Sequence, residues 1–232
     1  MSAGYIARVA ALGAPVLCFD TCTVLDLMRD PTRDSVRTHE RQAALDLLEA
    51  METNTNLVAL MAEQVGFEFG ENAKTVEDEA TQALEKLRDQ LARIDAVAAV
   101  YGGAGQASLS HLDDHMVRVR AVVDRWIGVA TLAAQGPDIA ARALLRVNRV
   151  RTPAKKGKDS MKDCVVIETY LDVVGELRAA DLGSKIVFVS SNTKDYAGEL
   201  GTILKLDLAQ EFAALGIEYA PNLAAAKHLL GL

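Results

Sequence analysis

The sequence predicts an α/β protein: a three-layer α/β/α arrangement with a central parallel sheet, plus an inserted helical hairpin. Short apolar runs such as VLCF (16–19) and IVFV (186–189) have the length and composition of buried strands. They alternate with longer stretches of helical periodicity, and strands that alternate with helices form parallel sheets covered on both faces. Alanine and leucine are abundant and aromatic residues make up only 5% of the 232 residues, which favours helix.

The predicted core elements lie at the two ends of the chain. The first strand is 16–19, a helix follows over about 36–51, and NTNLVAL (54–60) marks a turn into a second strand. Residues 63–72 have a helical pattern. In the last third we expect a helix from about Asp159, a strand in SKIVFVSSN, a helix over 206–215, a strand at IEYA and a closing helix at NLAAAKHLL.

Residues 74–150 are predicted to be a helical insertion within one domain that spans 1–232. A helix is expected over 76–97, where apolar residues recur at helical spacing from Ala80 to Ile94. The glycine-rich YGGAGQAS follows, and a second helix is expected over about 110–134. Two amphipathic helices joined in this way form an αα-hairpin. Its apolar stripes suit either internal packing or a contact with a partner, including a homodimer.

Composition limits the function classes. The net charge is −7, from 25 basic and 32 acidic side chains, which disfavours a protein that coats nucleic acid. No apolar run approaches the ~20 residues of a membrane span, so no membrane association is expected. Three cysteines without a CxxC pair are typical of a reducing compartment and predict a cytoplasmic protein.

Acidic residues follow the predicted strands. Asp20 ends the first strand, Glu63 and Glu68 follow the second, Asp195 follows IVFVSSN, and Asp159 and Asp163 open a helix. Ligands of open parallel sheets bind outside the carboxyl ends of the strands. Carboxylates that meet there repel one another unless a cation holds them, and Mg²⁺ or Mn²⁺ prefers such oxygen ligands. Taken singly, Asp159 and Asp195 are equally well explained as helix caps.

Basic residues are concentrated just before this acidic helix. Between 142 and 162 the sequence has eight of them, opposed only by Asp159: Arg142, Arg146, Arg149, Arg151, Lys155, Lys156, Lys158 and Lys162. In an acidic protein, such a segment beside a carboxylate site indicates a clamp for a phosphate backbone. The alternative is a solvated linker.

Four segments in order resemble the PIN-domain nucleases. They are VLCFDTCTVLD (16–26), LVALMAEQVGFEFGEN (57–72), KDSMKDCVVIETYLDV (158–173) and IVFVSSNTKDY (186–196). The resemblance covers about 1–73 and 151–232 and selects Glu68, with Glu63 as second choice. It departs from the family at Thr193, where an aspartate is frequent.

The resemblance implies a Mg²⁺- or Mn²⁺-dependent endoribonuclease, and many bacterial relatives are toxins of toxin–antitoxin systems with a protein inhibitor. It implies RNA as partner. The implied residues are Asp20, Glu68, Asp163 and Asp195 for catalysis, the same four with Asp159 for metal binding, and Thr21, Ser191 and Asn192 for substrate binding. The basic segment adds expected substrate contacts: Arg151, Lys155, Lys156, Lys158 and Lys162.

Three alternatives stay open at this point. FDTCTV is similar to the opening of haloacid-dehalogenase-type phosphatases, but Cys22 stands where their second aspartate does, and a thiol with a pKa near ~8.5 replaces it poorly. The chain is also compatible with a PIN-like module that binds RNA or protein without cutting. His111 and His115, four residues apart on a helix, fit either a metal pair or a polar helix face.

Overall fold

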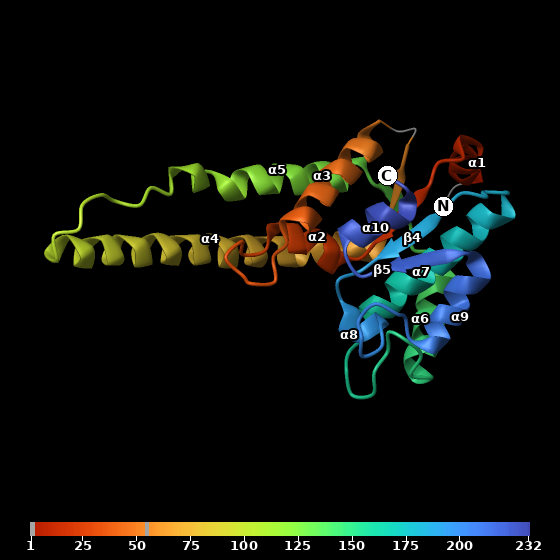
Figure 1. Cartoon of the computed structure of the whole chain (residues 1–232). Coiled ribbons are helices and arrows are strands. Elements are labelled where there is room, and N and C mark those ends of the chain that lie inside the picture. Colours follow the sequence, from red (N-terminus) through yellow and green to blue (C-terminus); the bar gives the residue numbers. More distant parts are fainter. Residues whose placement is uncertain (1–2, 54–55) are drawn as a thin grey trace.

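The computed structural model describes residues 3–53 and 56–232, so the start of the predicted turn at 54–55 lies outside the described residues. Five strands form one parallel sheet in the order β3-β2-β1-β4-β5. Helices lie on both of its faces, which confirms the predicted α/β/α class (Figure 1). The strands are β1 (Val16–Phe19), β2 (Val58–Ala62), β3 (Thr131–Ala133), β4 (Ile186–Val189) and β5 (Ile217–Ala220).

The central strands are short, apolar and buried along their whole length. All four residues of β1 and of β4 are buried, as expected for parallel strands with a helix layer on each side. β1 and β4 pair in register, with Phe19 opposite Val189. The next residues, Asp20 and Ser190, therefore leave the sheet side by side at its carboxyl edge.

One face of the sheet is covered by helices around α7 (Met161–Ala179). Ten of the 19 residues of α7 are buried, including the continuous run 164–170, because the sequence is apolar on more than one side of the helix. Among the described residues four helices contact it: α1 (Ala3–Leu12), α4 (Glu63–Val100), α6 (Pro137–Asn148) and α9 (Leu206–Leu215).

The opposite face is covered by α2 (Thr21–Met28), α3 (Thr38–Glu52), α5 (His115–Val129) and α10 (Leu223–Leu230). Trp126 of α5 anchors this layer. Its ring meets Phe19 edge to face at 5.7 Å between centroids, and its indole N–H donates to the carbonyl of Ala44.

The two helices predicted over 63–72 and 76–97 are one continuous helix, α4 (Glu63–Val100). The intervening residues 73–75 are Ala, Lys and Thr, and without glycine or proline nothing breaks the hydrogen-bond ladder. Buried residues occur along α4 up to Leu84; beyond it the helix leaves the body and runs beside α5 as an arm (Figure 1).

The segment 74–150 was expected from the sequence to be helical throughout, but it also contains a strand. It contains β3, which pairs with β2 at the edge of the sheet, and α6, which packs on α7. A three-residue strand carries too few residues for its alternation to be recognised. The projecting part is the outer half of α4, the loop 101–114 with the short helix η1 (Ser110–Leu112), and the start of α5.

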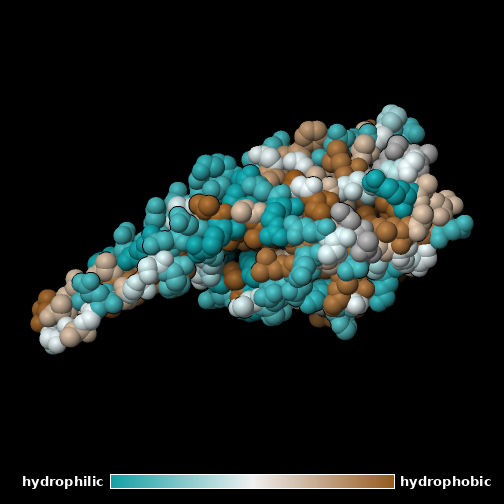
Figure 2. Space-filling model, turned by 90° about the horizontal axis from the view of Figure 1, so that it is seen from above, coloured by the Kyte–Doolittle hydropathy of each residue, from teal (hydrophilic) through white to brown (hydrophobic). Residues whose placement is uncertain are grey.

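The arm ends in exposed apolar side chains. Val100 and Tyr101 are 80% and 86% exposed, and hydrophobic residues gather at the far end of the arm in Figure 2. Within the described residues, no helix is long and apolar enough to span a membrane.

Candidate active site

Asp20 is a buried carboxylate at the junction of β1 and α2, with 3% of its surface exposed. Its backbone N–H continues the sheet by donating to Val189, and its Oδ1 accepts the N–H of Thr21 at 2.8 Å, which caps α2. Burial raises the pKa of Asp20, while its hydrogen bonds act in the opposite direction. Asp20 therefore caps α2, and its burial disfavours the ionised form of its carboxylate.

Two side chains hold the second oxygen of Asp20, and the sequence analysis assigned no role to either. Ser190 donates from Oγ to Oδ2 at 2.8 Å, and Cys22 donates from Sγ at 3.1 Å. Ser191, the serine expected from the sequence to bind substrate, is half-buried and has no hydrogen bond to Asp20. The register of β1 and β4 would have identified Ser190, because it is the residue that follows the strand beside Asp20.

Glu68 is the second acid of the site. Its Oε2 accepts the hydroxyl of Thr21 at 3.0 Å, so Thr21 links the end of β1 to α4. Burial raises the pKa of Glu68 and this bond lowers it. Glu63, the second choice, accepts the backbone N–H of Gln135 instead. The structure therefore favours Glu68.

Asp163 lies in the first turn of α7, half-buried, and no described residue donates a hydrogen bond to its carboxylate. Burial raises its pKa, and the negative charges of Asp20 and Asp195 raise it further, to about 7. The charge of Glu68 acts in the same direction, whereas the ammonium of Lys158 opposes it. The four acids selected from the sequence thus act on one another across one site.

Asp195 sits on α8 (Thr193–Tyr196) and is neutralised by two lysines. Lys155 reaches Oδ1 at 2.7 Å, Lys158 reaches Oδ2 at 2.5 Å, and the Asn192 amide donates to Oδ2 at 2.7 Å. Burial alone would raise the pKa of Asp195, but these donors outweigh it and lower the pKa to about 2. Asn192, expected to bind substrate, here orients a carboxylate.

Asp159, predicted as a further metal ligand, is exposed and accepts the backbone N–H of Met161 at 3.2 Å. That contact belongs to the start of α7. The N-cap residue of α7 is Ser160, and the role of Asp159 as a metal ligand stays a prediction.

The comparisons with known proteins agree with this geometry. A family model described as PIN domain matches residues 17–196, more than half of the chain and all four acids. The chain belongs to the PIN-domain family. Neither the curated proteins nor the solved structures contain a significant match to it. PIN domains are generally nucleases and typically use divalent metal ions. The matched range runs through the arm and β3.

Two buried tyrosines complete the surroundings of this PIN-domain site. The Tyr170 hydroxyl donates to the carbonyl of Phe19 at 2.6 Å and accepts the N–H of Ala62 at 3.0 Å, so it pins the ends of β1 and β2. Tyr196 is fully buried, and its hydroxyl has no hydrogen-bond partner in the described structure. Burial raises the pKa of Tyr196 well above its ordinary value, and the nearby charges of Asp20 and Asp163 add to this.

The donor set fits a hard divalent cation, although the carboxylates do not already form a closed ligand shell. Among the described residues, no three His, Cys, Asp or Glu side chains are close enough to hold a metal ion, and this includes the His111 and His115 region. The fit rests on chemistry. Asp163 and Glu68 have raised pKa values, and with Asp20 they act electrostatically on the buried Tyr196 hydroxyl, which has no hydrogen-bond partner among the described residues. A cation would relieve the repulsion among the carboxylates.

Most of the basic segment is already paired. Arg146 is buried and bonds Glu168 and Glu211, so it belongs to the core of the α6–α7–α9 layer. The other pairs are Arg142 with Glu168 and Asp172, Arg151 with Glu211, Lys162 with Glu71, and Lys155 and Lys158 with Asp195. The acidic partners of these residues are distant in sequence, so the sequence showed the basic charges without the acids that pair with them. The role of the segment as a phosphate clamp stays a prediction.

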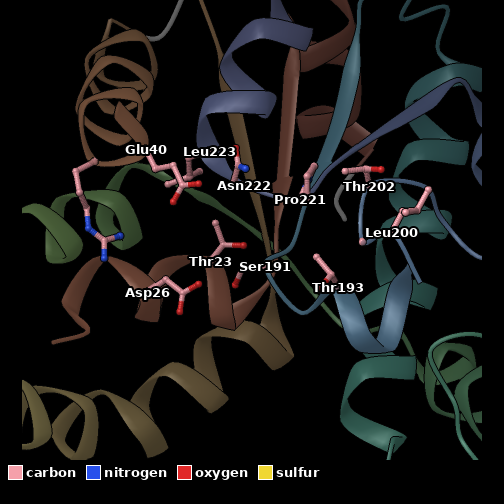
Figure 3. Close-up of a pocket in the computed structure, with 12 residues that line it drawn as sticks. Thr23, Asp26, Glu40, Ser191, Thr193, Leu200, Thr202, Pro221, Asn222 and Leu223 are labelled. Carbon is pink, nitrogen blue, oxygen red and sulfur yellow. The ribbon is translucent and has the colours of Figure 1, made fainter. Parts of the chain in front are cut away.

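A polar cavity of about 400 Å³ opens beside the site. Thr23 and Ser191 lie between Leu200 and Thr202 on one side and Glu40 and Leu223 on the other (Figure 3). Thr193, Pro221 and Asn222 complete the surface drawn there, with Asp26 at its edge. Ser191 directly follows Ser190, so the cavity adjoins the residue that holds Asp20.

Proposed function

We propose that this PIN domain is a Mg²⁺- or Mn²⁺-dependent endonuclease that hydrolyses phosphodiester bonds of RNA. The observation that carries the proposal is Asp163: a carboxylate without a hydrogen-bond donor among the described residues, in the electrostatic field of Asp20 and Glu68, at the carboxyl edge of the sheet. Such an arrangement is unfavourable for the protein alone and favourable with a cation.

Asp20, Glu68 and Asp163 are the proposed metal ligands. Ser190 and Thr21 hold the first two through hydrogen bonds, which orient their oxygens. A divalent ion bound there lowers the pKa of water toward neutrality and offsets negative charge on a phosphate.

The cavity beside the site has the size to receive a nucleoside that flanks the scissile phosphate. Its hydroxyl and carboxylate groups offer partners for a ribose hydroxyl, the group that distinguishes RNA from DNA. Lys156 and Arg149 are exposed, and no described residue forms a salt bridge with either, so they remain available for the phosphate backbone.

The environment of Cys22 argues against the phosphatase alternative. Cys22 donates to Asp20 and is half-buried, and burial raises the pKa of its thiol, so it cannot serve as a general acid in place of a carboxylate. A binding module without cleavage remains the second candidate, since the lysines already neutralise Asp195. The toxin role and a protein inhibitor stay predictions from the resemblance, and a homodimer stays a prediction from the apolar stripes of the hairpin.

The test is RNA cleavage with Mn²⁺ and with Mg²⁺. Asp20→Asn and Glu68→Gln are expected to lower the cleavage rate by at least about a hundredfold, because each removes a ligand charge. The matched control is Glu63→Gln, five residues earlier on the same helix, which should leave the rate unchanged since Glu63 bonds Gln135. Intact RNA from the unsubstituted chain under every metal tried would favour the binding module instead.

A further inference from the structure

We infer that Lys155 and Lys158 take the place of a second metal ion in this PIN domain. The site would then bind one divalent ion, between Asp20, Glu68 and Asp163, and present two ammonium groups next to it. The inference rests on the proposed function, because it concerns the cation content of the same site.

The first observation is the geometry at Asp195. Its side chain is 4% exposed and both of its oxygens are in contact with ammonium groups, Lys155 at 2.7 Å and Lys158 at 2.5 Å. Oδ2 also accepts a hydrogen bond from the Asn192 amide. Little of this carboxylate is left to coordinate a metal ion.

The second observation is the position of Lys158 relative to the other acids. Besides its contact with Asp195, its charge acts on Asp163 across the site. Ions in two-metal sites lie about 3.5–4 Å apart, so the charge of each ion also acts on the carboxylates around the other. Two ammonium groups together carry the charge of one divalent ion, so the pair supplies the same neutralisation.

The third observation is that the lysine loop is held in place. Thr152 donates to Asp207 of α9 with both its N–H and its hydroxyl, each at 2.7 Å, and its carbonyl accepts Arg146. The loop then turns at Gly157, whose φ of +79° suits glycine, and Lys158 N–H bonds the carbonyl of Lys155. The two lysines are therefore directed to the site by anchored backbone.

The fourth observation is access. Lys155 and Lys158 side chains are 39% and 48% exposed, although the carboxylate that they hold is buried. Their outer faces can meet a phosphate oxygen of the substrate, which is the task a second metal ion performs in phosphodiester hydrolysis.

The experiment counts Mn²⁺ ions by isothermal titration and by electron paramagnetic resonance, without substrate. The unsubstituted chain is expected to bind one ion. Asp163→Asn should weaken Mn²⁺ binding by at least about tenfold, whereas Asp195→Asn should change the Kd less than about threefold, because both oxygens of Asp195 are held by Lys155 and Lys158. These single changes alter no side-chain volume appreciably, so folding is preserved.

A variant without the two ammonium groups tests directly whether the lysines take the place of a second metal ion. Lys155→Met/Lys158→Met exposes the Asp195 oxygens and is expected to bind a second, weaker Mn²⁺; Lys156→Met, in the same loop and without a pairing acid among the described residues, should still bind one. Two ions in the unsubstituted chain, with one lost in Asp195→Asn, would overturn the inference and leave the proposed function intact. A count of one in the double variant would also overturn it. No bound ion together with intact RNA would overturn both.

Discussion

The Ser190 hydroxyl donates a hydrogen bond to Oδ2 of Asp20 at 2.8 Å and thereby joins the ends of two neighbouring parallel strands. Ser190 is fully buried, and its neighbour Ser191 faces the cavity instead. The position of the Asp20 carboxylate therefore depends on β4 as well as on β1.

We expect Ser190→Ala to weaken Mn²⁺ binding by about tenfold or more, because a hydrogen bond to a ligand orients it. It should also cost about 1 kcal/mol of unfolding free energy, the usual worth of such a bond. Titration calorimetry and urea unfolding measure the two effects. Ser191→Ala is the control: it should leave Mn²⁺ affinity unchanged, and an equal loss in both variants would contradict the assignment.

Asp163→Asn is expected to stabilise the metal-free protein, and more so at about pH 8 than at about pH 5. The folded pKa, about 7, lies above the ordinary value of 3.8, so folding disfavours the ionised carboxylate. That unfavourable contribution is fully present above pH 7 and disappears as the pH falls toward 4. Melting temperatures in EDTA at both pH values test this.

The control for this pH dependence is Asp159→Asn, an exposed acid one turn earlier. Its melting temperature should differ from that of the unsubstituted chain equally at both pH values. A gain for Asp163→Asn that did not depend on pH would argue against a disfavoured charge.

Leu200→Glu should weaken RNA binding, because it places a negative charge at the cavity beside the site. Leu200 is 82% exposed, so folding and Mn²⁺ affinity should not change. Ile203→Glu adds the same charge to the same loop at a residue 67% exposed that does not line the cavity. Equal RNA affinities of the two variants, measured by fluorescence anisotropy, would mean that the cavity takes no part in binding.

Arg146→Met is expected to destabilise the fold by about 3–5 kcal/mol, since it leaves Glu168 and Glu211 without their buried partner. Arg149→Met, an exposed position on the next turn, should change the unfolding free energy by less than about 0.5 kcal/mol. Urea unfolding distinguishes a structural arginine from a phosphate contact. Similar unfolding free energies for the two variants would contradict the structural role of Arg146 and favour the phosphate contact predicted from the sequence.

The α/β class and the strands before Asp20 and Ser190 were predictable from the chain alone, because a buried strand is continuously apolar. A carboxylate placed directly after such a strand is costly to bury, so Asp20 was also recognisable as a candidate site residue. The choice of Glu68 over Glu63 came from the family resemblance and not from a local pattern. β3 was not predictable, because three residues show no period, and the continuity of α4 was missed because the helical patterns on either side of 73–75 were assigned to two helices.

What the sequence by itself determined is therefore the order of the strands along the chain and the residue types at their ends, since both follow from local hydrophobic pattern. The tertiary structure decided which charged and polar side chains meet. Arg146 pairs with Glu211, Lys158 with Asp195, and Thr21 with Glu68, over separations of 65, 37 and 47 residues. Electrostatic interaction depends on distance in space and on burial, and the spacing of residues along a chain contains neither quantity.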